Sequence, residues 1–273
     1  MVGYLGPKGT FSEQAALLYF NNLDKNEFVP FVTIQDVLQA VDKGKIEKGI
    51  VPIENSIEGA VNTTIDMLAF EVDLKIQAEI VIPISHNLIG YKEFPLSKIK
   101  QVLSHSQAIA QCRNYLYENI PNAEIIFTSS TAEAVKQISF SKEPKAAIGT
   151  SLAAKEYGLY ILDKDIQDKE HNKTRFVVIG KEEGKIKEKS KTSLVFSTEN
   201  KPGELYKILN IFSLWDINMT KIISRPSKTK LGEYIFFIEL EGHIFEPDMK
   251  DALTMVQRKT SFFKLLGSYE IFE

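Results

Sequence analysis

Short polar turns follow several apolar, β-branched runs in the first 180 residues, and they hold residue types that could bind and activate a small ligand. Their hydroxyl and amide groups stand where a following helix would begin, so each turn taken singly is typical of a plain helix cap. Together, without a G-x-G-x-x-G or P-loop motif, they favour a small carboxylate ligand over a nucleotide. The residues are Thr10, Phe11 and Glu13; Glu54, Asn55 and Ser56; Ser104, His105 and Gln107; and Ser129, Ser130 and Thr131.

One further polar stretch, residues 168–176, leads into the last apolar run of this region. From spacing alone, Asp168 and Asn172 would make turn bonds and Arg175 would lie on a solvated strand face; a ligand site is the other interpretation. Covalent catalysis is not indicated, because the sequence has no G-x-S-x-G elbow and Cys112 falls within a helical segment.

The elements that must position these turns form an α/β domain over residues 1–180. Apolar runs alternate with amphipathic segments, as in parallel strands joined by helices. The carboxyl ends of such strands meet at one edge of a sheet, so we expect the polar turns to lie close together. The predicted strands are 2–5, 28–31, 49–53, 74–82, 101–103, 124–127, 146–148 and 175–179.

A second domain follows a charged segment. Residues 181–191, KEEGKIKEKSK, hold one apolar residue and are predicted to be a linker. Beyond it, strands at 192–197, 218–224, 234–240 and 263–272 and helices at 204–214 and 248–256 give a βαββαβ order. This order predicts a ferredoxin-like domain over residues 192–273.

The composition limits which binding partners and which cellular compartment we expect for this protein. The 273 residues suffice for two domains, and 36 acidic against 33 basic residues give a net charge of −3, which does not favour nucleic acid or an anionic membrane as partner. The single cysteine excludes an internal disulfide, and neither it nor the four histidines show metal-ligand spacing. No signal peptide or membrane span is predicted, so we expect a cytoplasmic protein with a small-molecule ligand.

Several segments resemble one enzyme family. GYLGPKGTFSEQAA, VPIENSIEGAVNTTIDML, SHSQAIAQC, TSSTAEAV and DKEHNKTRF are similar, in order and spacing, to the signatures of prephenate dehydratases. KPGELYKILNIF and ISRPSK resemble two segments of the ACT regulatory module. The chain thus resembles a monofunctional prephenate dehydratase with a C-terminal ACT domain.

The resemblance implies a fold and a reaction. The family's first domain has two lobes like type II periplasmic binding proteins, here about 1–78 plus 164–180 and about 79–163, which could close on a substrate. The implied reaction converts prephenate to phenylpyruvate, carbon dioxide and water in L-phenylalanine biosynthesis, without a cofactor. Arogenate dehydratase and a non-catalytic amino-acid or keto-acid sensor remain the alternatives.

The resemblance also assigns roles to residues. Thr174 would donate a hydrogen bond to the leaving oxygen. Glu54 and Asn55 match the family's Glu-Asn pair and would also be catalytic, with Glu54 either a proton source with a raised pKa or a structural acceptor. Arg175 would bind a substrate carboxylate, with Phe176 packed behind it. The other substrate-binding residues would be Thr10, Phe11, Ser56, Ser104, Gln107, Gln111, Ser130 and Thr131.

In the second domain, the resemblance implies feedback regulation by L-phenylalanine, bound across the interface of a homodimer or of a dimer-of-dimers tetramer. Two residues depart from the family pattern, Glu204 where an alanine is usual and Ile223 where an acid is usual. The effector residues would be Pro202, Gly203, Glu204, Leu205, Ser224, Arg225 and Pro226.

Overall fold

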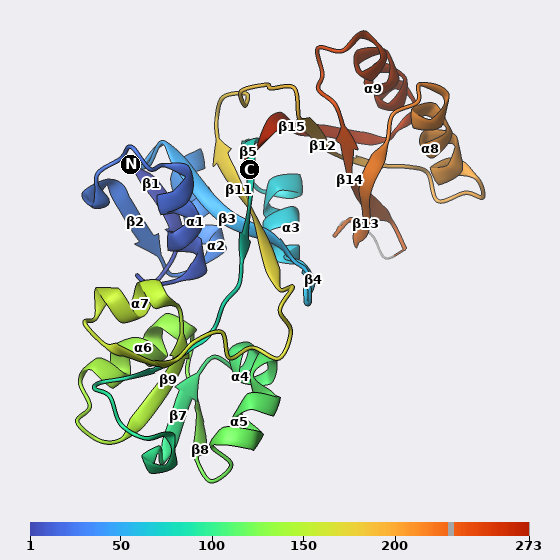
Figure 1. The fold of residues 1–273 in the computed structure, drawn as a ribbon. Helices are drawn as coiled ribbons and strands as arrows, with labels where there is room; N and C mark the ends of the chain where they lie inside the picture. The colour runs from blue at the N-terminus through green and yellow to red at the C-terminus, as the bar shows by residue number, and fades with distance from the viewer. Residues whose placement is uncertain (229–231, 273) are drawn as a thin grey trace.

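The computed structural model describes residues 1–228 and 232–272. It has two α/β lobes, one below the other in Figure 1, and a C-terminal βαββαβ unit beside the first lobe. The predicted fold class, two α/β lobes followed by a ferredoxin-like unit, is confirmed. Within the described ranges, no helix combines the length and apolar character needed to cross a membrane.

The first lobe is built on part of a ten-stranded sheet with the order β13-β14-β12-β15-β5-β11-β3-β1-β2, in which β4 also pairs with β3. Strand β1 is parallel to β2 and β3, whereas β11 is antiparallel to both β3 and β5. The strands are β1 (Val2–Leu5), β2 (Phe28–Phe31), β3 (Lys48–Asn55), β4 (Gly59–Ala60), β5 (Lys75–Pro83) and β11 (Lys173–Gly180). The helices are α1 (Phe11–Tyr19), α2 (Ile34–Asp42) and α3 (Asn62–Phe70), with a 3-10 turn at Lys25–Glu27.

The second lobe has a five-stranded sheet with the order β10-β6-β9-β7-β8. Strands β6 and β10, like β4 of the first lobe, were not predicted; β6 pairs antiparallel with β9, and β10 pairs antiparallel with β6, outside the alternation of parallel strands and helices that the sequence showed. The strands are β6 (Asn87–Gly90), β7 (Gln101–Ser104), β8 (Glu124–Phe127), β9 (Lys145–Gly149) and β10 (Tyr160–Asp163). The helices are α4 (Ser106–Gln111), α5 (Arg113–Asn119), α6 (Thr131–Ser139) and α7 (Ser151–Glu156), with a 3-10 turn at Leu96–Lys98.

Two chain segments connect the lobes. Strand β5 stays in the first lobe's sheet as far as Pro83, and β6 opens the second lobe at Asn87, so the first crossing lies about five residues later than the predicted boundary at 78–79. The chain returns between β10 and β11. The predicted boundary is too early because the apolar pattern of β5 does not change between residue 78 and the end of the strand at Pro83.

The C-terminal unit continues the first lobe's sheet. Its strands are β12 (Ser190–Ser197), β13 (Met219–Pro226), β14 (Tyr234–Glu241) and β15 (Phe262–Phe272), and its helices are α8 (Glu204–Leu214) and α9 (Pro247–Lys259). Strand β15 pairs in parallel with β5, Glu270 opposite Ala78, so one sheet runs through both units. Because β12 begins at Ser190, the irregular connecting segment is 181–189, two residues shorter than predicted.

Hydroxyl residues in the turns begin several helices, as the sequence predicted. Thr10 accepts the backbone N–H of Glu13 at the start of α1, and Ser130 accepts that of Glu133 at the start of α6. Each bond satisfies one of the amide groups that a helix leaves unpaired at its first turn. The helix starts therefore have fixed positions at the strand ends.

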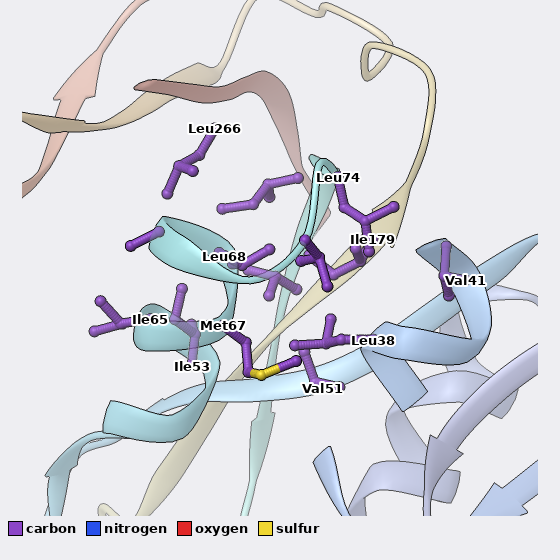
Figure 2. Close-up of a cluster of buried hydrophobic side chains, with 14 of the residues drawn as sticks. Leu38, Val41, Val51, Ile53, Ile65, Met67, Leu68, Leu74, Ile179 and Leu266 are labelled. Carbon is purple, nitrogen blue, oxygen red and sulfur yellow. The ribbon is translucent and has the colours of Figure 1, made fainter. Parts of the chain in front are cut away.

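One apolar core joins the first lobe to the C-terminal unit. Leu68 of α3 and Val51 of β3 belong to the same buried cluster as Phe237 of β14 and Leu266 of β15. Figure 2 shows Leu266 facing the helix that carries Ile65 and Leu68. Burial of apolar surface is the main stabilising contribution to folding, so this shared core couples the two units.

Replacing Leu266 by alanine should destabilise both units together. Leu266 is fully buried in the shared core, and such truncations cost about 2–5 kcal/mol. We expect one cooperative thermal transition by circular dichroism, shifted to lower temperature. Leu214→Ala is the control, because Leu214 is 72% exposed. Two separate transitions, or equal effects of both substitutions, would contradict a shared core.

Candidate active site

A cavity of about 400 Å³ lies between the two lobes, within the size range of small-molecule sites. The first lobe contributes Asn55 from the end of β3 and Thr174 from the start of β11. The second lobe contributes Gln107 and Gln111 from α4 and Ser130 from the start of α6. Predicted residues far apart in the sequence are thus brought together here, and Phe11 and Thr131 also line the cavity.

Thr174 and Asn55 are directly bonded at the edge of this cavity. The two residues stand opposite each other in the β3–β11 pairing, and Asn55 Nδ2 donates to Thr174 Oγ1 over 2.8 Å. Asn55 Oδ1 accepts the backbone N–H groups of Ile57 and Glu58 at 3.0 and 3.1 Å, which fixes the orientation of the amide. Since the Thr174 oxygen accepts from Asn55, its own proton is free to point at a ligand.

A chain of side-chain hydrogen bonds extends from Asn55 across the cavity to His86. Asn55 Nδ2 also donates to Asn172 Oδ1 over 2.8 Å, and Asn172 Nδ2 donates to Gln111 Oε1 over 3.0 Å. His86 Nε2 lies 2.9 Å from the same Gln111 oxygen, which can only accept, so the proton of His86 is on Nε2. With its oxygen used twice, Gln111 has its amide N–H groups left for a ligand.

The resulting cavity is rich in neutral donors. Ser129, Ser130 and Thr131 stand at the N-terminus of α6, where unpaired backbone N–H groups and the helix dipole favour an anion. Among the described lining residues none is lysine or arginine, and Glu58 is the one carboxylate. The arrangement suits an anionic ligand held by hydrogen bonds and not by a guanidinium.

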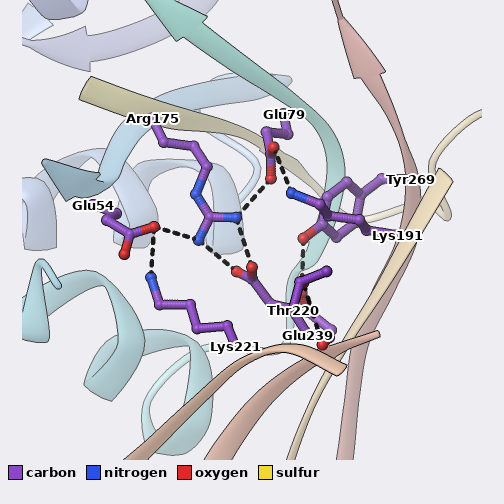
Figure 3. Close-up of polar contacts among 9 residues, drawn as sticks. Glu54, Glu79, Arg175, Lys191, Thr220, Lys221, Glu239 and Tyr269 are labelled. Atoms are coloured by element: carbon purple, nitrogen blue, oxygen red, sulfur yellow. Dashed lines mark hydrogen bonds and ion pairs between the residues drawn. The ribbon is translucent and has the colours of Figure 1, made fainter. Parts of the chain in front are cut away.

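Arg175 does not line this cavity, so the predicted role as a carboxylate ligand is corrected. Its side chain leaves the opposite face of β11 from Thr174, because successive side chains of a strand alternate. Its guanidinium is bound by Glu54, Glu79 and Glu239 at 2.6 to 3.0 Å (Figure 3). Phe176 packs in an apolar cluster with Val2 and Tyr4 and not behind Arg175.

Glu54 is corrected in the same way. Its carboxylate lies 2.8 Å from Lys221 Nζ and 3.0 Å from Arg175 Nη2, outside the cavity lining. Burial opposes its ionisation, but the hydrogen bond from Lys221 and the charges of Arg175, Lys221 and Lys191 outweigh that effect and lower the pKa of Glu54. A carboxyl group with a lowered pKa is a poor proton source, so the prediction of a raised pKa is wrong.

Three other predicted ligands fall outside the lining and have structural bonds instead. The Ser104 hydroxyl is fully buried and donates to the carbonyl of Ile148 over 2.8 Å. Thr10 donates to the carbonyl of Leu5, and Ser56 accepts the backbone N–H of Lys173, both over 2.9 Å. These residues hold the turns that border the site.

The sequence interpretation missed two members of the hydrogen-bonded chain. His86 follows β5 at the crossing between the lobes, is 3% exposed, and its ring meets that of Phe11 edge-on at 5.7 Å. Asn172 was interpreted as a turn residue, yet it is buried and joins Asn55 to Gln111. The available signal was position, because both residues stand on the two segments that cross between the lobes.

The predicted effector residues lie at one end of the C-terminal sheet. β12 ends at Ser197 opposite Ile235, and β13 ends at Pro226 opposite Tyr234, so the turn after β12 is at the same end as the end of β13. Gly203 has a φ of 82° at the N-cap of α8, a conformation that glycine adopts without steric cost. The residues at this end are Pro202, Gly203, Glu204, Leu205, Ser224, Arg225 and Pro226.

Arg225 is already engaged within the chain. Its Nε and Nη2 donate to the two carboxylate oxygens of Asp66 on α3, at 3.0 and 2.9 Å. Lys228 lies 3.0 Å from the same carboxylate. A ligand that uses Arg225 would have to share it with Asp66.

Three comparisons with known proteins bear on this site. The sequence model of the prephenate dehydratase family matches residues 2–184. The prephenate dehydratase of Methanocaldococcus jannaschii is 44% identical over 278 residues, 99% of this chain and 98% of that protein. A crystal structure of prephenate dehydratase from Arthrobacter aurescens in complex with L-Phe has a TM-score of 0.89 at 34% identity, covering 98% of this chain and 89% of that one. The chain belongs to the prephenate dehydratase family.

The same fold occurs in a protein described by another activity. GqqA, described as a novel type of quorum quenching acylase, has a TM-score of 0.88 at 25% identity, covering 99% of this chain and 98% of that one. Fold alone therefore does not determine the reaction, which depends on the residues of the site.

The environment of His86 predicts a pH-dependent stability. Burial lowers the pKa of His86 and outweighs the opposing bond to Gln111, so folding favours the neutral ring. The unfolded chain takes up a proton at about pH 6.5. The contribution of His86 to the free energy of unfolding is therefore present above pH 6.5 and lost as the pH falls below it.

His86→Gln keeps an N–H donor but cannot titrate. Between about pH 6.5 and 5, urea denaturation should show a steeper loss of unfolding free energy in the wild type than in His86→Gln. Equal slopes would contradict a buried neutral ring.

Proposed function

We propose that this chain is a prephenate dehydratase that forms phenylpyruvate in L-phenylalanine biosynthesis. The observation that supports it most is the bond from Asn55 to Thr174 Oγ1, which leaves the hydroxyl proton free for a ligand in the interlobe cavity. In the reaction the ring carboxylate leaves as carbon dioxide, its bonding electrons enter the ring, and the carbon–oxygen bond to the hydroxyl breaks. One proton is taken up, and prephenate dianion becomes phenylpyruvate anion, carbon dioxide and water.

Thr174 acts on the leaving oxygen as a hydrogen-bond donor. A threonine hydroxyl is too weak an acid to supply a free proton, but it stabilises the negative charge that develops on the departing oxygen. Asn55 keeps the hydroxyl in this orientation before the substrate arrives. The effect is greatest in a site that excludes water, which closure of the two lobes would provide.

The carboxylates are held by the neutral donors of the second lobe. The free amide N–H groups of Gln111, the side chain of Gln107 and the N-terminus of α6 at Ser130 line the cavity opposite Thr174. Each interaction is weaker than a guanidinium pair, but several preorganised donors together bind and orient a dianion. No cofactor is needed, because aromatisation of the ring drives the reaction.

The C-terminal unit carries the regulation and the assembly of the enzyme. L-phenylalanine binds at the end of the C-terminal unit where the turn at Gly203 and the strand at Ser224 lie together, in a homodimer or in a tetramer of two dimers. The protein works in the cytoplasm, where its single cysteine, Cys112, stays a buried free thiol.

Thr174→Val should remove the donor and keep the shape. We expect kcat for prephenate to fall by about 100-fold and KM to change by less than about twofold, since the bond acts on the leaving oxygen in the transition state. Thr174→Ser should keep most of the activity. Ultraviolet detection of phenylpyruvate measures both, and Thr254→Val on the exposed face of α9 is the control. Wild-type activity retained by Thr174→Val would contradict this role.

The same assay separates the alternatives. Arogenate carries an ammonium group where prephenate has its keto oxygen, and Glu58 could pair with that group at the cavity edge. Faster turnover of arogenate than of prephenate would make the chain an arogenate dehydratase. Turnover of neither, with L-phenylalanine binding retained in calorimetry, would make it a sensor.

A further inference from the structure

Strands β3 and β11 carry two adjacent pairs of residues that face opposite sides of the sheet. On one face, Asn55 bonds Thr174 at the cavity; on the other, Glu54 pairs with Arg175 over 3.0 Å. The strand register places Thr174 opposite Asn55 and Arg175 opposite Glu54. The same two strand segments therefore hold the catalytic pair and an ion pair directly behind it.

The ion pair is bound from the C-terminal unit. Glu239 of β14 accepts from Nη1 and Nη2 of Arg175 at 2.6 and 2.7 Å, a bidentate geometry that fixes the plane of the guanidinium (Figure 3). Lys221 of β13 holds Glu54 at 2.8 Å. Each member of the pair behind the cavity is thus held by one residue of the C-terminal unit.

This cluster is balanced in charge, and its members are largely buried except for Glu54, whose side chain is 37% exposed. Glu239 and Glu79 are 1% and 2% exposed, and Arg175 is 9% exposed. Lys191 of β12 completes the cluster through Glu79, 2.8 Å away. Three cations thus meet three carboxylates, and loss of one charge would leave another buried without compensation, which forces the remaining groups to rearrange.

We propose that Arg175 and Glu54 are positioning residues, through which Glu239 and Lys221 of the C-terminal unit set the geometry of the Asn55–Thr174 bond. The inference rests on the proposed function. A change in the C-terminal unit that moves Glu239 or Lys221 shifts the β3 and β11 segments that carry the catalytic pair. A small displacement suffices, because rates fall steeply when a donor and its reacting atom are misplaced.

The test uses the full chain and substitutions in the C-terminal unit. Glu239→Gln keeps the shape and removes one charge; kcat for prephenate should fall by at least about tenfold while KM changes by less than about twofold. Asp66→Asn is the matched control, because it also breaks a bidentate arginine pair between the two units, and neither Asp66 nor Arg225 lies on β3 or β11. Its kcat, measured without phenylalanine, should stay within about twofold of the wild type.

A double-mutant cycle separates positioning from a general structural effect. If Glu239 acts through Thr174, then Glu239→Gln should change the residual kcat of Thr174→Val by less than about twofold, whereas independent effects multiply. If circular dichroism shows that Glu239→Gln does not fold, Lys221→Met takes its place in the cycle. The proposal would be overturned if the losses in kcat of the two single variants multiply in the double variant, or if Glu239→Gln and Asp66→Asn have equal kcat. An inactive wild type would instead refute the proposed function.

Discussion

The hydrogen bond from the Asn55 amide to the Thr174 hydroxyl is the interaction on which the site depends. Two backbone N–H groups fix the amide, the amide makes the Thr174 oxygen an acceptor, and the hydroxyl proton is left for the ligand. The same amide continues through Asn172 to Gln111, whose oxygen is used twice and whose N–H groups are left free. The groups of this hydrogen-bonded network that are left for an anion, the Thr174 hydroxyl and the Gln111 amide N–H groups, are therefore all donors.

The sheet explains how this arrangement is held. Strand β11 pairs with β3 on one side and β5 on the other, and β5 pairs with β15 of the C-terminal unit. Because side chains alternate along a strand, Thr174 and Arg175 face opposite sides of the same sheet. The Asn55–Thr174 pair therefore has a shared apolar core and an ion cluster behind it, and both include residues of the C-terminal unit.

The sequence predicted what depends on local chemistry. The caps Thr10 and Ser130 and the site residues Asn55, Gln111 and Thr174 belong to polar turns at strand ends, and a sheet edge brings such turns together. Arg175 was assigned wrongly because its partner Glu239 is 64 residues away and on another unit, which no local pattern indicates. His86 was missed for a related reason, since its role arises only when the crossing segments bring it to Gln111.

Asn55→Asp tests the central claim most directly, because it keeps the shape of the side chain and turns the donor toward Thr174 into an acceptor. The Thr174 hydroxyl would then donate to the new carboxylate and be lost to the substrate. The measurement is kcat for prephenate of the folded variant, and we predict a loss of about 100-fold, similar to removal of the hydroxyl itself. Activity within about twofold of the wild type would show that the Asn55 amide does not make Thr174 a donor.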